Sequence, residues 1–413
     1  MREIIGVIVA FALILWLVGR KVQLGLVMLY SSTVLGLFAG GFEDPHRLLV
    51  TDYKALTDRD TIEFVVVIAL ITALARLMGD LSFLEAMSNA LARLLRSTKL
   101  ALVTVPGVIG CLPVFGGAVI SAPMVDSLGD RLDLDPDRKA AINIIFRHTW
   151  FFVFPFIPSL MLAARIAELD VSQLIRLQWP MTAAGIIAGY LYFFGRMPRE
   201  SADGAVFRFW PDLRDFLVNG APLLIAVILG VGLPVPFIGV VKPPLYVGLA
   251  TGIAVGMVLG RRHPNFRWDL PIRGVQWTMV WAMLGVMLFR WTVNEVTFFP
   301  VLIDNLIRAG VPLAVLCVAL PMAIGMASAS QATTIALTYP ILLSIVPAGS
   351  SRALYAMLIY VSSYMAYMVS PLHLCQVFTV QYFGANLSKV YRYYVVPMSA
   401  ILVSMVAVYF IAR

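Results

Sequence analysis

The sequence has little charge for its length. Only 13% of its 413 residues are Asp, Glu, Lys or Arg, and 60% are hydrophobic. A soluble domain of ordinary composition carries about 25% charged residues. The charged residues stand in short clusters, separated by apolar runs of roughly 20 residues, the length that the hydrocarbon core of a bilayer requires. The composition excludes the soluble globular class and predicts an all-α polytopic membrane protein.

Cysteine is scarce, and familiar enzyme motifs are absent. Cys111, Cys317 and Cys375 lie in apolar surroundings and none belongs to a CxxC pair. We therefore expect structural thiols, with no disulfide framework and no metal site built on cysteine. The sequence contains no HExxH, GxSxG, Walker or GxGxxG motif, so it predicts a protein that is not an enzyme. A membrane-embedded enzyme or receptor that uses Cys111, His148 or His373 is the alternative from another class.

Basic residues outnumber acidic ones and give a formal net charge of +8. They flank the apolar spans, as the positive-inside rule describes, and no basic tract suits nucleic acid. We expect a multi-pass protein of the inner (cytoplasmic) membrane, with no nucleic-acid partner. The first 21 residues could pass for a signal peptide but lack an A-x-A-like cleavage site, so we predict a retained transmembrane helix there.

Apolar runs predict the helices of the first part of the chain, residues 1–197. The expected long helices are 4–19, 22–40 and 61–78 (the scaffold helices of region 4–78), a broken helix at 137–168, and 172–195. Segment 83–97 places apolar residues at helical spacing and its arginines on other faces, which predicts a helix lying in the membrane interface.

Segment 98–130 is too long for one membrane crossing. An unbroken helix of that length would extend about 50 Å. Its centre reads PGVIGCLPVFGGAVISAP, and we expect these glycines and prolines, Pro106 and Pro123 among them, to divide it into two half-helices around a tip.

A polar linker at 198–212 separates the first part from a second, 213–413, in which the pattern recurs. The expected elements are 213–231, 243–260, 272–292, an interfacial 297–309, an interrupted segment 311–346, a broken helix 350–385, and 390–412. Pro123 matches Pro340, and Pro155 matches Pro371. The matching order and prolines predict a duplicated architecture of two repeats.

Two topologies fit this duplication. If segments 98–130 and 311–346 are re-entrant hairpins, each repeat has about five transmembrane helices and the repeats are inverted. If the segments cross the membrane, each repeat has six and the repeats are parallel. Both flanks of the first segment are basic, with Arg93, Arg96 and Arg131 among the residues nearest its ends. This favours the hairpin model, with both flanks of the first segment on the cytoplasmic side and both termini outside.

Interrupted helices at matching positions of two repeats are the best sequence indication of a transport site. Backbone groups freed at a break need protein, water or a ligand as partners. Half-helix N-termini attract anions, whereas carbonyl groups suit sodium. The candidate tip residues are Gly116, Gly117 and Ser121 in the first segment, and Ser328, Ser330, Gln331, Thr333 and Thr334 in the second. Close helix packing, which favours the same small residues, is the alternative explanation.

The broken helices add a second group of candidates beside Pro155 and Pro371. These are Asn143, Arg147 and His148 in the first repeat, and Ser370, His373 and Gln376 in the second. Arg147 either contacts an anion or extends to the membrane interface. His148 suits a core position, whereas His373, beside a predicted break, is the better candidate for a ligand or a proton relay.

Acidic residues are rare within the predicted spans. Glu63 and Glu295 lie near helix ends, and Asp80 and Asp126 lie at boundaries. Cation/proton antiport needs a buried carboxylate as a rule, so their rarity favours an anionic or neutral solute. A cation/proton antiporter or an anion exporter is the alternative within transport.

GGAVISAP at 116–123 and NIIFRHTWFFVFPFIPS at 143–159 resemble an uncharacterised prokaryotic family of integral membrane proteins. That family is grouped in the ion-transporter superfamily with gluconate permeases, citrate carriers and divalent-anion/sodium symporters. The resemblance implies inverted repeats, a homodimer and a transport domain that moves like an elevator. The divalent-anion symporters carry Ser-Asn-Thr at both tips, whereas this chain has GGA at one and SAS and ATT at the other, so the resemblance does not extend to dicarboxylate specificity.

Together, these features predict a secondary active transporter in the lipid bilayer. Its expected solute is a small, carboxylate-like organic anion, coupled to sodium at the hairpin tips or to protons, and no further cofactor is expected.

Overall fold

The computed structural model describes residues 2–20, 22–112, 117–197, 208–231, 233–235, 239–241, 245–296, 298–344, 346 and 350–413. Apart from two short antiparallel strands, β1 (Leu233–Val235) and β2 (Gly239–Val241), these residues form helices and their connections. The predicted all-α class is confirmed for this part of the chain.

The described residues up to 197 contain ten α-helices. They are α1 (Arg2–Gly19), α2 (Leu24–Gly36), which continues into a π-helical turn η1 (Leu37–Gly41), α3 (Pro45–Thr57), α4 (Arg59–Asp80), α5 (Phe83–Leu95), α6 (Thr98–Gly110), α7 (Gly117–Asp130), α8 (Pro136–His148), which continues into a 3₁₀ turn η2 (Thr149–Phe152), α9 (Pro158–Ala167) and α10 (Val171–Phe194).

A further ten follow residue 207. They are α11 (Phe209–Val231), α12 (Leu245–Gly260), the single turn α13 (Leu270–Arg273), α14 (Trp277–Asn294), α15 (Phe298–Arg308), α16 (Leu313–Ser328), α17 (Gln331–Leu343), α18 (Ser350–Val369), α19 (Leu374–Phe383) and α20 (Leu387–Ala412).

Five helical segments of the described chain are long and apolar enough to cross a membrane. They are Leu24–Gly41, Arg59–Asp80, Phe209–Gly230, Arg352–Phe383 and Leu387–Ala412. Shorter apolar helices cover Thr98–Gly110, Pro158–Ala167, Leu245–Gly260 and Leu313–Ser328. The short helices belong mainly to the interrupted segments, where no single helix has to span a full bilayer.

Local sequence explains several of the helix starts. Asp135 accepts a hydrogen bond from the Arg138 amide at the start of α8, where a proline occupies the first turn. Asp170 forms a capping box with Gln173 at the start of α10, and Ser330 caps α17 by accepting from the Thr333 amide. Such caps satisfy N–H groups that a helix leaves without partners.

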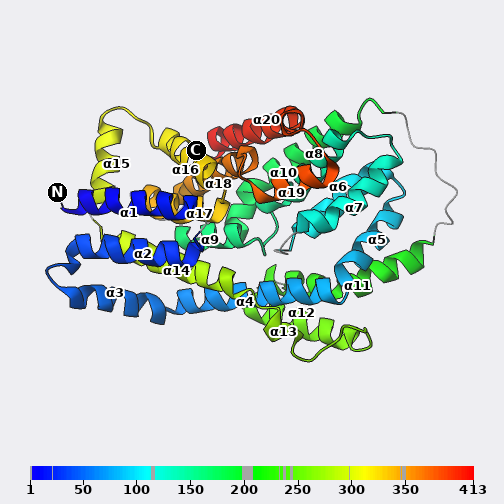
Figure 1. The fold of residues 1–413 in the computed structure, drawn as a ribbon, viewed down its shortest axis with the longest axis horizontal. Coiled ribbons are helices and arrows are strands. Elements are labelled where there is room, and N and C mark those ends of the chain that lie inside the picture. The colour runs from blue at the N-terminus through cyan, green and yellow to red at the C-terminus, as the bar shows by residue number, and fades with distance from the viewer. Residues whose placement is uncertain are drawn as a thin grey trace.

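Two groups of helices are visible in Figure 1. The lower group contains α2, α4, α11, α12 and α14, in which α2 packs on α14 and α4 packs on α12. The upper group contains α6 to α10 and α16 to α20, in which α10 packs on α20. Four fully buried tyrosines, Tyr339, Tyr360, Tyr364 and Tyr394, lie in the upper group.

The two interrupted segments form helical hairpins, α6–α7 and α16–α17. Each hairpin packs on the first part of the broken helix that follows it, α6 on α8 and α16 on α18. Its returning helix also contacts the second part of the other broken helix, α7 on α19 and α17 on α9. The same pairing therefore occurs twice, and it brings the two breaks into the middle of the upper group.

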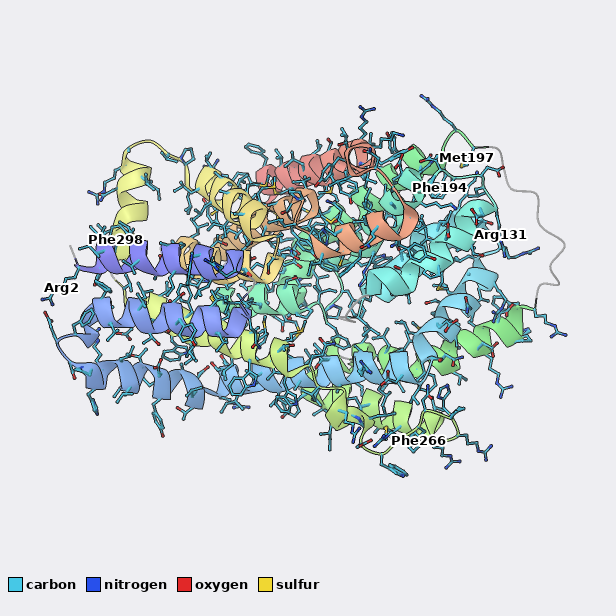
Figure 2. All side chains as sticks on the ribbon, in the orientation of Figure 1. Arg2, Arg131, Phe194, Met197, Phe266 and Phe298 are labelled. Atoms are coloured by element: carbon cyan, nitrogen blue, oxygen red, sulfur yellow. The ribbon has the colours of Figure 1, made fainter. Side chains whose placement is uncertain are left out.

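The hairpins lie toward different ends of the molecule. Figure 1 places α6 and α7 in the right half of the view and α16 and α17 in the left half. In Figure 2, Arg131 and Met197 mark the right end, and Arg2 and Phe298 mark the left end. The Phe298 amide donates to the Glu3 carboxylate, which ties α15 to the start of α1.

Some boundaries differ from the sequence-based expectation. Apolar runs do not predict α3, which is too polar for a membrane span, although Asp44 caps it and Pro45 begins it. The helix α11 begins at Phe209, inside the expected linker 198–212, because its packing against α5 stabilises the earlier start. The remaining linker residues 198–207 lie outside the described chain.

The positions of the prolines also differ from expectation. Pro106 and Pro123 lie inside α6 and α7 and do not end them. The interruption falls between Gly110 and Gly117, and its tip, which includes Gly116, lies outside the described residues.

Candidate solute-binding site

The first broken helix is interrupted directly after Arg147 and His148. The α-helix α8 ends at His148, the 3₁₀ turn η2 follows, and α9 begins only at Pro158. Pro155 lies in the non-helical connection. Because proline has no N–H and its ring excludes the preceding helical turn, Pro155 and Pro158 favour a break here.

The second broken helix is interrupted at Ser370–His373, between α18 and α19, and Pro371 lies inside this break. The Ser370 hydroxyl donates to the Met326 carbonyl oxygen at 2.9 Å, near the end of α16. The break is therefore attached to the second hairpin two residues before Ser328.

Arg147 is a buried cation, two of whose side-chain nitrogens have no partner among the described residues. Its side chain lies in the last turn of α8 and is 6% exposed. Its Nε and Nη1 atoms have no hydrogen-bond partner among the residues that the structure describes. The side chains that interact with it electrostatically include Cys375, Tyr367, His148 and His373, none of them a carboxylate. The alternative in which Arg147 extends to the interface is wrong for this structure, because the side chain is enclosed by protein.

The backbone of α6 holds Arg147 in place. A Cβ atom on Gly110 would lie 2.3 Å from the Arg147 carbonyl oxygen and 2.7 Å from its Cγ. Only glycine permits this approach. The negative end of the α8 dipole also favours a cation in its last turn. A buried charge without a partner costs several kcal/mol, so the enclosed guanidinium has the character of an anion-binding group.

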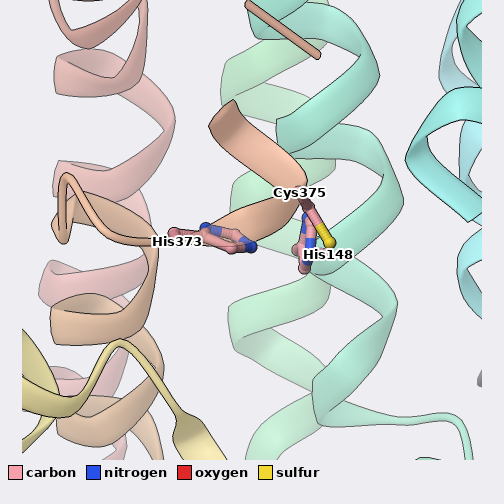
Figure 3. Close-up of side chains that lie close together, drawn as sticks. All are labelled: His148, His373 and Cys375. Carbon is pink, nitrogen blue, oxygen red and sulfur yellow. The ribbon is translucent and has the colours of Figure 1, made fainter. Parts of the chain in front are cut away.

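His148 and His373 lie next to each other across the two breaks. Their ring centroids are 4.9 Å apart, and both side chains are buried. Figure 3 shows the His373 ring pointing toward His148 and Cys375. The Tyr367 ring stacks on His373 at a centroid distance of 3.8 Å. One imidazole from the first break therefore meets an imidazole and a thiol from the second break in a single cluster.

The two histidines differ in their hydrogen bonds. His148 Nδ1 lies 2.7 Å from the Ile144 carbonyl oxygen, which fixes Nδ1 as the donor. Neither ring nitrogen of His373 has a partner among the described residues, although the side chain is fully buried. A buried polar group without a hydrogen bond is uncommon in folded proteins and indicates a binding function or a bound solvent molecule.

Ser121 and Asn143 belong to a buried hydrogen-bonded group that joins the two halves. The Ser121 hydroxyl donates to Asn143 Oδ1 at 2.6 Å, and Asn143 Nδ2 donates to the Thr379 hydroxyl at 3.3 Å. These residues come from α7, α8 and α19. The group connects the first hairpin to both broken helices.

A second group joins the equivalent elements of the other hairpin. The Ser159 hydroxyl on α9 donates to Gln331 Oε1 on α17 at 3.0 Å and lies 3.3 Å from the Tyr360 hydroxyl on α18. Tyr360 in turn donates to the Phe151 carbonyl oxygen. Ser159 and Tyr360 have no local sequence signal, because a serine and a tyrosine in apolar helices are common packing residues.

The tip of the second hairpin is a compact turn of hydroxyl side chains. Ala329 adopts a left-handed conformation with φ of 48° between Ser328 and Ser330. The Thr333 hydroxyl donates to Ser330 Oγ at 2.7 Å, and the Thr334 hydroxyl donates to the Ser330 carbonyl oxygen at 2.9 Å. These hydroxyls are therefore occupied within the tip itself.

Gln376 has a complete set of structural partners. Its Nε2 donates to the Tyr391 hydroxyl, and its Oε1 accepts from the Tyr394 hydroxyl, each at 2.9 Å. These bonds tie α19 to α20, and they leave Gln376 less available to a solute than Arg147 or His373.

The structure thus brings Arg147, His148 and His373 together at the two breaks, with Ser370 linking them to the second hairpin. Ser121 and Asn143 form a separate packed group, Gly117 begins α7, and Gly116 lies outside the described residues. Neither Cys375 nor Tyr367 is predicted from the sequence to be a neighbour of this cluster. The spacing of His373 and Cys375, two residues apart at a helix start, is the only local signal that could have indicated it.

The family model described as "Protein of unknown function (DUF401)" matches residues 4–411, so the chain belongs to that family. No curated protein sequence matches it. Among solved structures, the chain is similar to the YdaH transporter of Alcanivorax borkumensis, described as having an unusual topology. The TM-score is 0.61 with 14% sequence identity, over 96% of this chain and 97% of the other. At this identity the likeness shows a shared fold.

Proposed function

We propose that this DUF401 protein is a secondary active transporter of a small organic anion, carboxylate-like in chemistry. The observation that carries the proposal is Arg147, a buried guanidinium with Nε and Nη1 unpartnered among the described residues. A carboxylate would offer two acceptor oxygens to the planar fork of the guanidinium. The shared fold with a transporter supports movement of a solute rather than binding alone.

The distribution of acidic residues supports an anion over a cation. Among the acidic residues that the structure describes, only Asp212 is buried, and it accepts a hydrogen bond from Arg93. Of the two candidates of the antiporter alternative, Glu63 is only partly buried and Glu295 forms an exposed ion pair with Arg47. No enclosed carboxylate in the described chain lies ready to bind a proton or a metal cation for exchange.

The proposed mechanism uses the two matched hairpins as inverted repeats in an elevator-type transporter. Support comes from the repeated pairing of each hairpin with the broken helix of the other half, α7 with α19 and α17 with α9. The upper group of helices would move as one body against the lower group. In this proposal the protein is a homodimer, sodium or protons drive transport, and membership of the ion-transporter superfamily would explain the layout.

The decisive experiment is uptake into proteoliposomes. Purified protein is reconstituted and offered a panel of radiolabelled mono-, di- and tricarboxylates under imposed sodium or proton gradients. We expect gradient-driven accumulation of at least one anion, and the gradient that supports it identifies the coupling ion. Absence of flux for every anion in both directions, from protein that is folded and correctly inserted, would refute the proposal.

The contribution of Arg147 is tested with a matched control. A hydrogen bond to a charged group contributes about 1.5–3 kcal/mol, so we expect Arg147→Gln to weaken anion binding about 10- to 100-fold. Arg165→Gln is the control, because it removes an arginine that pairs with Asp60 away from the breaks. Equal loss in both variants would show that Arg147 has no specific role.

A further inference from the structure

We infer that His148, His373 and Cys375 form a binding site for a thiophilic transition-metal ion of the zinc class. One potential ligand atom from each residue lies within 4.8 Å of the others. Two imidazoles and one sulfur are ligands that zinc prefers, and a site with three protein ligands leaves one position open. The proposed metal site shares His148 and His373 with the candidate solute-binding site, but metal binding is tested without any transport assay.

The distances are close to those of an occupied site. In a tetrahedral zinc centre, bonds of about 2.0–2.3 Å place neighbouring ligand atoms roughly 3.3–3.8 Å apart. The widest separation in this cluster is within 4.8 Å, so the ligand atoms of the widest pair need to approach by up to about 1–1.5 Å. Rotation of the Cys375 and His373 side chains at the start of α19 can supply a movement of this size.

The hydrogen bonds of the histidines suit metal binding. Metal-bound histidines as a rule donate their other ring N–H to a carbonyl or carboxylate, which orients the ring. His148 does this through Nδ1 and the Ile144 carbonyl oxygen, which leaves the lone pair of Nε2 available. His373 is fully buried with both ring nitrogens unpartnered among the described residues, and a metal ion would give one of them a partner.

Cys375 supplies the sulfur ligand of the cluster. It lies in the first turn of α19, two residues after His373. Arg147 also interacts electrostatically with it. A thiolate would offset part of the charge that a divalent ion adds beside the guanidinium. Cys111 and Cys317 are buried thiols on α6–α7 and α16 that belong to no such group.

Optical titration with cobalt tests the site without any transport assay. Metal-free full-length protein in detergent is titrated with Co²⁺, which replaces zinc in such sites. We expect one equivalent to produce a thiolate-to-cobalt charge-transfer band with the visible bands of a tetrahedral ion, and Zn²⁺ to abolish both. Absence of the charge-transfer band in folded protein would overturn the inference.

Substitutions identify the residues that bind the metal ion. We expect Cys375→Ser to remove the charge-transfer band, and His373→Ala or His148→Ala to weaken Co²⁺ binding by two orders of magnitude or more. The controls are Cys317→Ser and His263→Ala, which alter a thiol and an imidazole outside the cluster and should retain the band. Size-exclusion profiles and melting temperatures establish that each variant is folded. A band that survives Cys375→Ser, or that depends on His263, would also overturn the inference.

Discussion

At the scale of single residues, the breaks of the two long helices gather groups that ordinary packing would keep apart. Arg147, His148 and His373 are enclosed together, and several of their polar atoms have no partner in the described chain. Two of these groups are adjacent in sequence, and the third comes from the opposite half. Such a cluster is costly for the folded state unless something binds there.

This cost leads to a prediction about stability. In the absence of solute, Arg147→Gln should leave the protein as stable as the wild type or raise the free energy of unfolding by about 1–3 kcal/mol, because an uncompensated buried charge is removed. The measurement is thermal unfolding in detergent, with and without a transported anion. At an anion concentration 100 times its Kd, the wild type should gain about 2.7 kcal/mol and the variant should gain much less.

The opposite result has a clear meaning. If Arg147→Gln lowers stability without ligand by several kcal/mol, the guanidinium already has structural partners, and its assignment to an anion would fail.

At the scale of elements, the position of each break depends on close contacts between helices. Gly110 on α6 approaches the end of α8 so closely that a side chain would collide with the Arg147 backbone. Arg352, near the start of α18, donates to the carbonyl oxygens of Ala167 and Leu343, the last residues of α9 and α17, and to that of Val346 just beyond α17.

Substitutions of glycine test the close approach of Gly110 to the end of α8. Gly110→Ala should destabilise the protein by about 1–3 kcal/mol and weaken anion binding, because the end of α8 has to move. Gly79→Ala is the matched control, since a Cβ at Gly79 on α4 meets nothing within 4 Å. In a helix that change should be neutral or stabilising by up to about 1 kcal/mol. Thermal unfolding and anion-binding isotherms of both variants provide the comparison, and similar effects at the two sites would argue against a close approach at Gly110.

Substitution of Arg352 tests its contacts with the carbonyl oxygens at the ends of α9 and α17. Arg352→Met should lower the free energy of unfolding by about 2–4 kcal/mol, because three buried carbonyl oxygens lose a charged donor. Arg392→Met, at an exposed position of α20, should change it by less than about 0.5 kcal/mol. Denaturant titration followed by tryptophan fluorescence measures both, and an Arg352 variant as stable as wild type would contradict the assigned role.

At the scale of the whole molecule, different parts of the chain lie at the two ends. Arg2 and Phe298 lie at one end, and Arg131 and Met197 lie at the other (Figure 2). The expected inverted repeats and cytoplasmic flanks of the first hairpin predict that the end marked by Arg131 faces the cytoplasm and the end marked by Arg2 faces outward.

Site-directed labelling checks this orientation. In a background without the three native cysteines, Arg131→Cys should react with a membrane-impermeant maleimide only in inverted vesicles, and Arg2→Cys only in intact cells or right-side-out vesicles. Labelling of both positions from one side would contradict the arrangement of the helices, and labelling from exchanged sides would contradict only the predicted orientation.

Much of the fold could be predicted from sequence because bilayer-length apolar runs and helix-breaking residues act locally. The hairpin α16–α17 and the break at Pro371 lie where glycine, proline and serine interrupt apolar helices. The same rules wrongly predict that Pro106 and Pro123 break the helix. Both lie inside intact helices, because neighbouring helices supply enough contacts to keep a helix intact around an internal proline. They also miss α3, whose polar composition gives no span signal.

The sequence by itself determined the membrane class, the helical fold and the candidate residues Arg147, His148 and His373, because these depend on local hydrophobicity, residue type and position beside helix-breaking prolines. Only the tertiary structure decided that Arg147 is enclosed and not at the interface, that Gln376 is occupied by tyrosines, and that Cys375 joins the histidines. Burial and partnership arise from contacts between segments more than 200 residues apart, such as α8 with α19, and no local pattern in the sequence encodes those distances.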